Sequence, residues 1–189
     1  MKPLVTPRLI IRNWEERDRD LFFLINSDDR VMEFFPFRRD RAQSDQLLDL
    51  LRNEIDEYGF GLAALELRES GQCIGFCGLR HVDIGPVLPP HAVEIGWRLS
   101  PQHWGRGYVT EAAGRWLEEG FGPVGLSEIV SFAVWNNRRS TAVMERIGMH
   151  RDPAGDFDHP RVPDTHAALR RHVLYRLTKA DWENARAAR

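Results

Sequence analysis

The chain has 189 residues, enough to bury one hydrophobic core but few for two domains, so a single domain over residues 1–189 is expected. Its 42% hydrophobic and 29% charged residues are typical of a globular protein, and a formal net charge of −2 provides no excess of positive charge for nucleic acid or an anionic membrane. No apolar run approaches the roughly 18 residues of a membrane span, and the N-terminal stretch becomes charged before a signal-peptide core could form, which predicts a cytoplasmic protein.

The first part of the chain has the pattern of one strand and two helices. Residues 8–14 are predicted as a short strand, and residues 16–27 as a helix in which charged residues precede an apolar cluster. A second helix is expected from Ser44, as its cap, to Gly59, where it ends. The apolar residues at helical spacing within this second helix are Leu47, Leu51, Ile55 and Tyr58.

The middle of the chain has the pattern of a β-hairpin followed by a strand, a helix and a strand. The hairpin strands are expected at 60–68 and 73–82, joined by a turn that contains a glycine. Further strands at 92–99 and 128–135 flank a helix that ends near residue 121. Because parallel strands need such a crossover, this order predicts a βαβ unit, which we place at one edge of a mainly antiparallel sheet.

Two cysteines, Cys73 and Cys77, lie in the second hairpin strand. Four residues apart in a regular strand, their side chains are expected to face the same side. The sequence has no second cysteine pair that could complete a zinc site. We therefore interpret both as small core residues and expect no metal.

The last part of the chain has the pattern of a helix, a polar loop, a strand and a helix. A short helix is predicted over 136–149, beginning with asparagine caps and ending at Gly148. A loop rich in Pro and Asp precedes a strand over 169–177, and Thr178 is the expected cap of a terminal helix. Together the elements predict an α/β (α+β) fold with a mixed, mainly antiparallel central sheet flanked by helices.

The junction between the strand 92–99 and its following helix contains two glycines, Gly105 and Gly107. A Gly-x-Gly turn lets the backbone approach a ligand closely, and the start of a helix binds phosphate groups well. A dinucleotide fingerprint would need a third small residue where Thr110 stands, and the Gly-Lys-Ser/Thr of a P-loop is absent from the sequence. A dinucleotide site is therefore the weaker alternative to another phosphate-bearing ligand.

Four stretches resemble the GNAT N-acetyltransferases and, within them, the RimJ/RimL-like branch. They are TPRLIIRNW from residue 6, CIGFCGL from 73, EIGWRLSPQHWGRGYVTEAA from 94 and NNRRSTAVMERIGM from 136. The resemblance implies a GNAT-like acyl-CoA N-acyltransferase fold, acetyl-CoA as co-substrate with its pyrophosphate at the glycine turn, and transfer of the acetyl group to a primary amine. Nucleic acid, membrane and metal are not expected as partners, and a homodimer is left open.

The resemblance also implies that acetyl-CoA lies along the glycine turn and against the start of the helix 136–149. The residues it implies for cofactor binding are Leu99, Trp104, Gly105, Arg106, Gly107, Tyr108, Val109, Thr110, Asn137 and Ser140. The family pattern Gln/Arg-x-x-Gly-x-Gly/Ala can start at Gln102 or at Trp104. The Trp-Gly-x-Gly-Tyr of the branch favours Trp104, which leaves the bulkier Val109 where the pattern has Gly or Ala. The alternative for Trp104 is a residue that packs beneath the turn.

Acetyl transfer to an amine requires a base, because α-amino groups and lysines, with pKa values of about 8 and about 10.4, are mostly protonated at neutral pH. Glu94, the one acidic residue in the strand before the turn, is the candidate base, and its alternative is a solvated or ion-paired strand carboxylate. The leaving thiolate benefits from a weak acid. Many members of the family place a tyrosine where Met144 stands, so Ser140 or a water is expected to act instead, unless Ser140 only favours the first helical turn.

The polar loop before the last strand carries Asp158 and His159. These two residues are the candidates for contact with the acceptor, because binding residues concentrate on loops over a rigid scaffold, and the alternative is a solvated loop with no binding role. The sequence does not choose between a protein or peptide N-terminus and a small amine. Because the tyrosine acid is missing, a non-catalytic acyl-CoA-binding or sensing protein is the alternative function.

Overall fold

The structure, a computed structural model, describes residues 1–188, and these fall into two compact units. The first comprises residues 1–80 and 96–115, and the second comprises residues 81–95 and those from 116 onward. Each unit has strands and helices of its own. Within the described part of the chain, no helix is long and apolar enough to cross a membrane.

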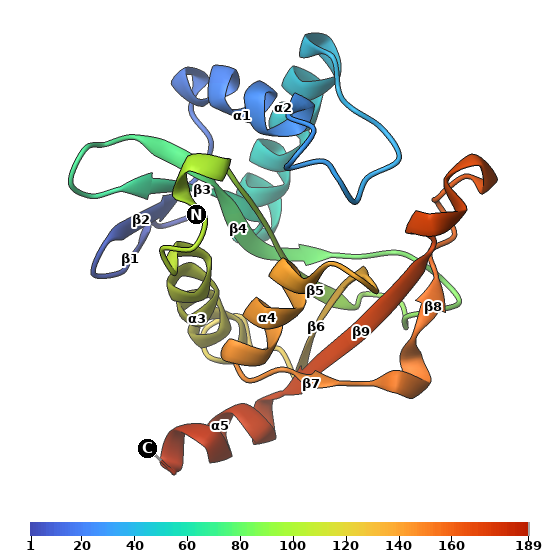
Figure 1. Cartoon of the computed structure of the whole chain (residues 1–189). Coiled ribbons are helices and arrows are strands. Elements are labelled where there is room, and N and C mark those ends of the chain that lie inside the picture. The colour runs from blue at the N-terminus through green and yellow to red at the C-terminus, as the bar shows by residue number, and fades with distance from the viewer. Residues whose placement is uncertain (189) are drawn as a thin grey trace. The chain divides into compact units, whose positions relative to one another are not determined.

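The first unit contains antiparallel strands that pair in chain order (Figure 1). β1 (Leu4–Val5) pairs with β2 (Leu9–Arg12), β2 pairs with β3 (Leu62–Leu67), and β3 pairs with β4 (Cys73–His81). The pairing of β3 with β4 confirms the predicted hairpin. The end of β5 (Val93–Leu99) lies beside β4, where a Cβ at Gly75 would clash with the carbonyl oxygen of Arg98.

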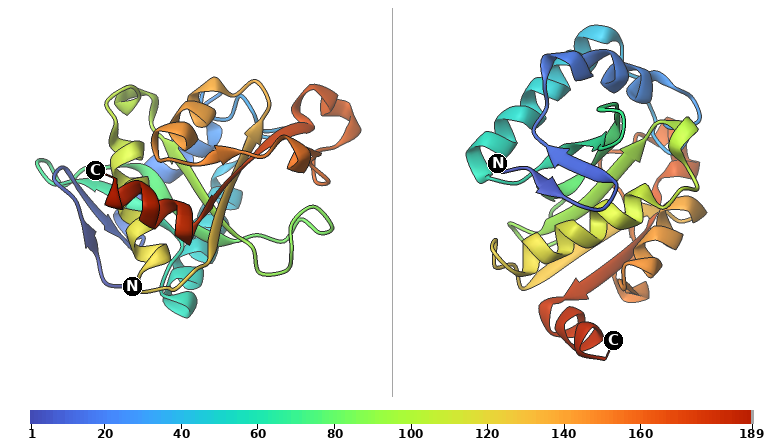
Figure 2. Two further views of the ribbon diagram at one scale, coloured as in Figure 1. Left: turned by 90° about the horizontal axis from the view of Figure 1, so that it is seen from below. Right: turned by 90° about the vertical axis from the view of Figure 1, so that its left-hand side faces the viewer.

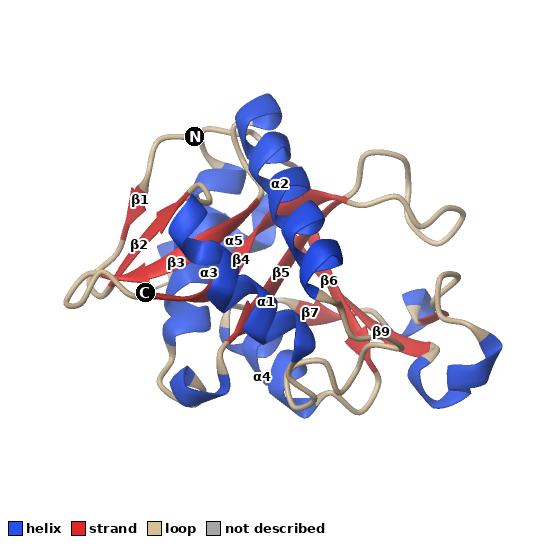
Figure 3. Cartoon of the chain, turned by 90° about the horizontal axis from the view of Figure 1, so that it is seen from above, coloured by secondary structure: helices blue, strands red, loops and turns tan. Residues whose placement is uncertain are grey.

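Two helices, α1 (Arg19–Ser27) and α2 (Arg41–Tyr58), lie side by side in the first unit (Figure 3). α2 begins earlier than expected, because Asp40 and Gln43 form a reciprocal cap. The Asp40 carboxylate accepts a hydrogen bond from the Gln43 amide, and the Gln43 side-chain oxygen accepts one from the Asp40 amide. The predicted cap, Ser44, is therefore wrong: this residue is buried inside the helix. The predicted end at Gly59 is confirmed, and its φ of +76° is in the left-handed region that favours glycine.

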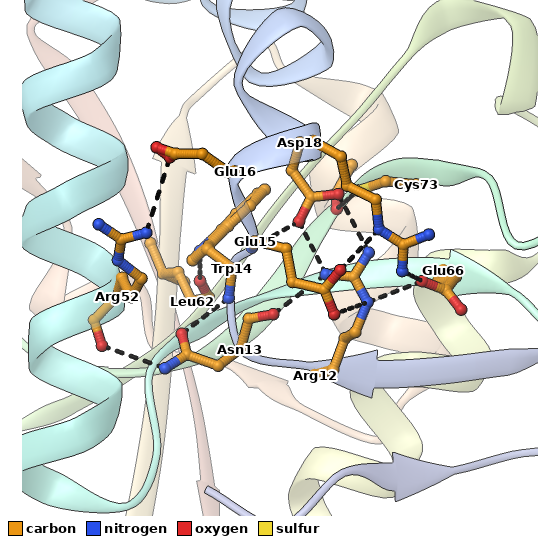
Figure 4. Close-up of polar contacts among 12 residues, drawn as sticks. Arg12, Asn13, Trp14, Glu15, Glu16, Asp18, Arg52, Leu62, Glu66 and Cys73 are labelled. Carbon is orange, nitrogen blue, oxygen red and sulfur yellow. Dashed lines mark hydrogen bonds and ion pairs between the residues drawn. The ribbon is translucent and has the colours of Figure 1, made fainter.

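A buried ion cluster joins β2 and β3 to the 3-10 turn (Glu16–Asp18) that leads into α1 (Figure 4). The Arg12 guanidinium donates to both carboxylate oxygens of Asp18, at 2.7 and 3.0 Å, and to Glu66 at 2.7 Å. Burial opposes the charge of Arg12, but these two carboxylates hold its pKa above the ordinary value. A buried guanidinium is stable here because it has partners on several sides.

The two cysteines are on opposite faces of the sheet, so the predicted common face is wrong. Leu65 pairs with Gly75 and Glu66 pairs with Cys73, so β4 has an extra residue in a bulge between them. Cys77, which pairs with Ala63, lies beyond this bulge and faces the other way. Both cysteines are free, and burial raises the pKa of Cys73 to about 12 and also raises that of Cys77. Both are therefore thiols at neutral pH.

In the second unit, β6 (Glu128–Val134) lies between two partner strands. It pairs in parallel with the start of β5, with Glu94 opposite Val130, and pairs antiparallel with β9 (Arg171–Thr178) along its whole length. The predicted βαβ unit is confirmed. Its predicted place at a sheet edge is wrong, because β9 forms hydrogen bonds with the edge of β6 that faces away from β5. Two short strands that were not predicted, β7 (His150–Arg151) and β8 (Phe157–Asp158), also pair with β9.

Three helices complete the described chain. α3 (Tyr108–Phe121) connects β5 to β6, α4 (Arg138–Arg146) follows β6, and α5 (Lys179–Ala187) leaves the end of β9 (Figure 2). Thr178 caps α5 as predicted, because its hydroxyl accepts the amide of Asp181. Trp182 of α5 packs on Phe121, with ring centroids 5.3 Å apart. The predicted α/β (α+β) class, with a mixed and mainly antiparallel sheet flanked by helices, is confirmed.

Candidate functional site

The turn between β5 and α3 has an open outer surface. It consists of a 3-10 turn (Pro101–His103), Trp104 and the segment 105–107. Gly105 and Gly107 have φ angles of +73° and +77°, a conformation that other residues adopt only with strain. A Cβ added at Gly105 would meet no atom within 4 Å. Both glycines are thus needed for the shape of the backbone, and the space beside Gly105 has room for a ligand.

The start of α3 has main-chain amides that the helix does not use. Its first helical hydrogen bond runs from the amide of Glu111 to the carbonyl of Gly107, at 3.0 Å. The amides of residues 107–110 precede that bond and therefore have no acceptor within the helix. Gly107 occupies the cap position and has no side chain to accept them. Orphan amides and the positive end of the helix dipole together make this turn suitable for a phosphate group.

Residues from the tip of the β1–β2 hairpin hold the turn in place. Arg8 donates from Nε and its amide to the Glu111 carboxylate, at 2.5 and 2.9 Å, and from Nη1 to the carbonyl of Arg106, at 2.9 Å. The hydroxyl of Thr6 donates to the same carboxylate at 2.6 Å. Burial alone would raise the pKa of Glu111, but these hydrogen bonds hold it below its ordinary value. We did not predict Arg8 or Glu111 as site residues, since the sequence separates them by more than 100 positions.

Two aromatic residues of the turn are held by contacts within the first unit. The indole nitrogen of Trp104 donates to the carbonyl of Leu99 at 2.8 Å. The guanidinium of Arg8 lies over the ring of Tyr108, 4.6 Å from its centroid. Both contacts fix side chains that the resemblance assigns to cofactor binding. The structure places all the predicted turn residues, from Leu99 to Thr110, in the first unit.

The remaining predicted residues belong to the second unit. Glu94 is partly buried on β5, beside Val130. Next to it, the hydroxyl of Ser131 donates to the carbonyl of Ile95 at 2.9 Å and ties β6 to β5. Asn137 and Ser140 lie together at the start of α4, where the Asn137 side chain accepts the amide of Ser140 at 3.2 Å. Met144 is buried on the same helix.

His159 lies in an aromatic cluster rather than in open solvent. Its ring centroid is 4.9 Å from that of His172 and 5.9 Å from that of Phe132. Burial, then His172 and Arg161, lower the pKa of His159 to about 4, so its imidazole is neutral at pH 7. Asp158, beside it, forms an ion pair with Arg171 at 3.6 Å. Among the residues described, no grouping of three His, Cys, Asp or Glu side chains could hold a metal ion.

Comparison with known proteins identifies the family. The family model described as the acetyltransferase (GNAT) domain matches residues 8–150. YnaD from Bacillus subtilis (strain 168), named an uncharacterized N-acetyltransferase, is 30% identical over 149 residues, which cover 79% of this chain and 83% of YnaD. The solved acetyltransferase from Agrobacterium tumefaciens str. C58 is 28% identical with a TM-score of 0.74, and 94% of each chain is covered.

A further solved structure shares the fold at lower identity. The microcin C7 self-immunity acetyltransferase MccE, solved in complex with acetyl-CoA and AMP, is 14% identical with a TM-score of 0.70. The match covers 92% of this chain and 93% of MccE. The family match spans most of the chain and includes both the glycine turn and the start of α4. The chain therefore belongs to the GNAT acetyltransferase family and is an N-acetyltransferase.

Proposed function

We propose that this enzyme uses acetyl-CoA as donor and binds its pyrophosphate at the amides of residues 107–110. The observation that carries the proposal is the start of α3, where two glycines with positive φ precede amides that no side chain of residues 1–188 caps. The residues present fit the group, because the space beside Gly105 is open and Arg8 braces the turn. MccE, which shares the fold, was solved with this ligand.

Acetyl-CoA supplies the thioester carbonyl that a neutral primary amine attacks. We propose Glu94 as the base that removes the proton of the arriving ammonium, directly or through a water. Ser140 is proposed to supply a proton to the departing thiolate, since the buried Met144 has no proton to donate. The side-chain oxygen of Asn137 accepts a hydrogen bond from the amide of Ser140. We therefore propose that Asn137 contacts acetyl-CoA through its side-chain NH₂ group.

For the acceptor, we propose the N-terminal amine of a protein or peptide, in line with the resemblance to the RimJ/RimL-like branch, with a small amine as the other class. Asp158 and His159 are proposed to contact it. The neutral ring of His159 favours packing or hydrogen bonding over charge recognition. A cytoplasmic location, with its supply of acetyl-CoA, completes this proposal.

The test is a panel of amines and peptides in which the release of free CoA is measured for each. The proposal predicts acceptor-dependent release for a peptide N-terminus or a small amine. Glu94→Gln should lower kcat and remove the rise of kcat with pH on the acidic side of its profile, and Ser140→Ala should lower kcat at unchanged stability. Unchanged kcat in either variant would remove that residue from the mechanism.

A further inference from the structure

A groove in the first unit lies apart from the glycine turn along the chain. It is formed by the loop before α2 and the first half of that helix, and has a volume of about 470 Å³. Small-molecule sites typically have volumes of about 300–1,000 Å³. Phe37, Leu47 and Leu50 form an apolar wall, and Phe37 and Leu50 remain 43% and 48% exposed. The groove thus offers apolar surface that the described residues leave uncovered.

The other residues that line the groove are Arg38, Arg39, Gln43 and Gln46. No carboxylate is among the described lining residues, so the groove has a positive charge. Arg38 is compensated by Asp29, at 2.8 Å.

Arg39 has no ion-pair partner in the described part of the chain. Its Nε is buried without a hydrogen-bond acceptor in residues 1–188, and its guanidinium lies over the ring of Phe37, 4.9 Å from the centroid. Burial, with no opposing carboxylate, lowers the pKa of Arg39. An arginine stays charged in proteins, so this cation is partly desolvated, and residues 1–188 supply no anion for it. Arg12, buried to a greater extent, has two carboxylates.

We propose that this groove binds an organic anion, a carboxylate or phosphate group attached to an aromatic or aliphatic body. The anion would accept hydrogen bonds from the Arg39 guanidinium, whose fork geometry suits both groups. The body would lie on Phe37, Leu47 and Leu50. This proposal does not depend on acetyl transfer, because it concerns a separate group of residues.

The first experiment is a titration of the ¹⁵N-labelled full chain, followed by amide chemical shifts. The ligands are benzoate, phenyl phosphate, benzyl alcohol as the neutral analogue, and inorganic phosphate as the anion without a body. Benzoate or phenyl phosphate should shift the amides of residues 37–50 and bind at least about tenfold more tightly than benzyl alcohol. Whichever of these two ligands binds more tightly shows whether the groove prefers a carboxylate or a phosphate group. Equal affinity for benzyl alcohol, equal affinity for inorganic phosphate, or shifts confined to residues 104–110 would overturn the proposal.

Variants then test the role of the charge. Arg39→Gln should weaken binding of the preferred anion about tenfold or more, and the variant should fold, because the substitution breaks no ion pair within residues 1–188. The control is Arg41→Gln, which changes the net charge equally at a residue already paired with Asp45 and Asp20. This control should change the affinity less than twofold. An equal loss in both variants would show a general charge effect and contradict the proposed site.

Discussion

At the start of α4 the side chain of Asn137 accepts the amide of Ser140, whereas at the start of α3 the cap position is Gly107, which has no side chain. α2 and α5 follow the first pattern, with Asp40 and Thr178 as caps. The turn before α3 is instead held from outside, by Arg8 and its bonds to Glu111 and Arg106. Where a side chain accepts the first amides of a helix, the cap stabilises the helix. Where the turn is held by other contacts and the first amides keep no acceptor, those amides can bind an anion.

The largest effect is expected when α3 receives a cap like that of α4. Gly107→Asp would place a carboxylate that accepts the amides of the first turn and repels a pyrophosphate. We expect the affinity for acetyl-CoA to fall about 100-fold, measured by calorimetry. The matched control is Gly107→Asn, because asparagine is a neutral capping residue that tolerates positive φ. Its affinity for acetyl-CoA should lie between those of the wild type and Gly107→Asp. Equal, small losses in both variants would indicate backbone strain alone.

The second-largest loss of acetyl-CoA affinity is expected when the contacts of Arg8 that hold the turn are weakened. Glu111→Gln keeps the shape of the side chain but removes the charge that holds Arg8. We expect acetyl-CoA affinity to fall about tenfold, because the turn is less well ordered before binding. Arg30→Gln, which breaks an exposed pair with Asp28, should leave affinity unchanged. An unchanged affinity in Glu111→Gln would show that the brace only serves folding.

Removing the cap of α4 should affect stability first. Asn137→Ala should lower the free energy of unfolding by about 1 kcal/mol and the Tm by roughly 2–4 °C. Asn137→Ser restores a capping oxygen, so it should restore stability, while the affinity for acetyl-CoA stays reduced if the NH₂ group of Asn137 contacts the donor. If serine restores both quantities, Asn137 is a cap and nothing more.

The smallest effect is a difference in pH dependence between the two helix starts. The pKa of Glu111 is lower in the folded chain than its ordinary value of 4.5, so the unfolded chain binds more protons in acid. The stabilisation by Glu111 is therefore complete above pH 4.5 and is lost as the pH falls through the folded pKa. The difference in unfolding free energy between wild type and Glu111→Gln should shrink from pH 7 to pH 3. The corresponding difference for Asn137→Ala should stay constant, because Asn137 does not titrate.

Local signals in the sequence predicted much of the fold. Gly59, Asn137 and Thr178 are helix boundaries that depend on a single residue and its neighbours, and each was found in place. The cap of α2 was missed because two capping residues, Asp40 and Ser44, stand close together, and only the first forms a reciprocal pair with the residue three positions on.

Features that depend on distant contacts were not predictable in the same way. The bulge that turns Cys73 away from Cys77 is visible only once β3 and β4 are paired. The position of β6 between two strands depends on β9, which is the last strand in the sequence. The hydrogen bonds that hold the turn join Arg8 to Glu111 across more than 100 residues, so the local sequence around either residue does not indicate the contact. The strands β7 and β8, of two residues each, are too short to show alternation.

We propose above that the amides at the start of α3 bind the pyrophosphate of acetyl-CoA. The most direct measurement compares amide chemical shifts of the ¹⁵N-labelled protein with acetyl-CoA and with S-acetylpantetheine, which lacks the pyrophosphate. Acetyl-CoA should shift the amide resonances of residues 107–110 strongly, and saturating S-acetylpantetheine should leave them nearly unchanged. Saturation by acetyl-CoA without a shift in those four amides would contradict it.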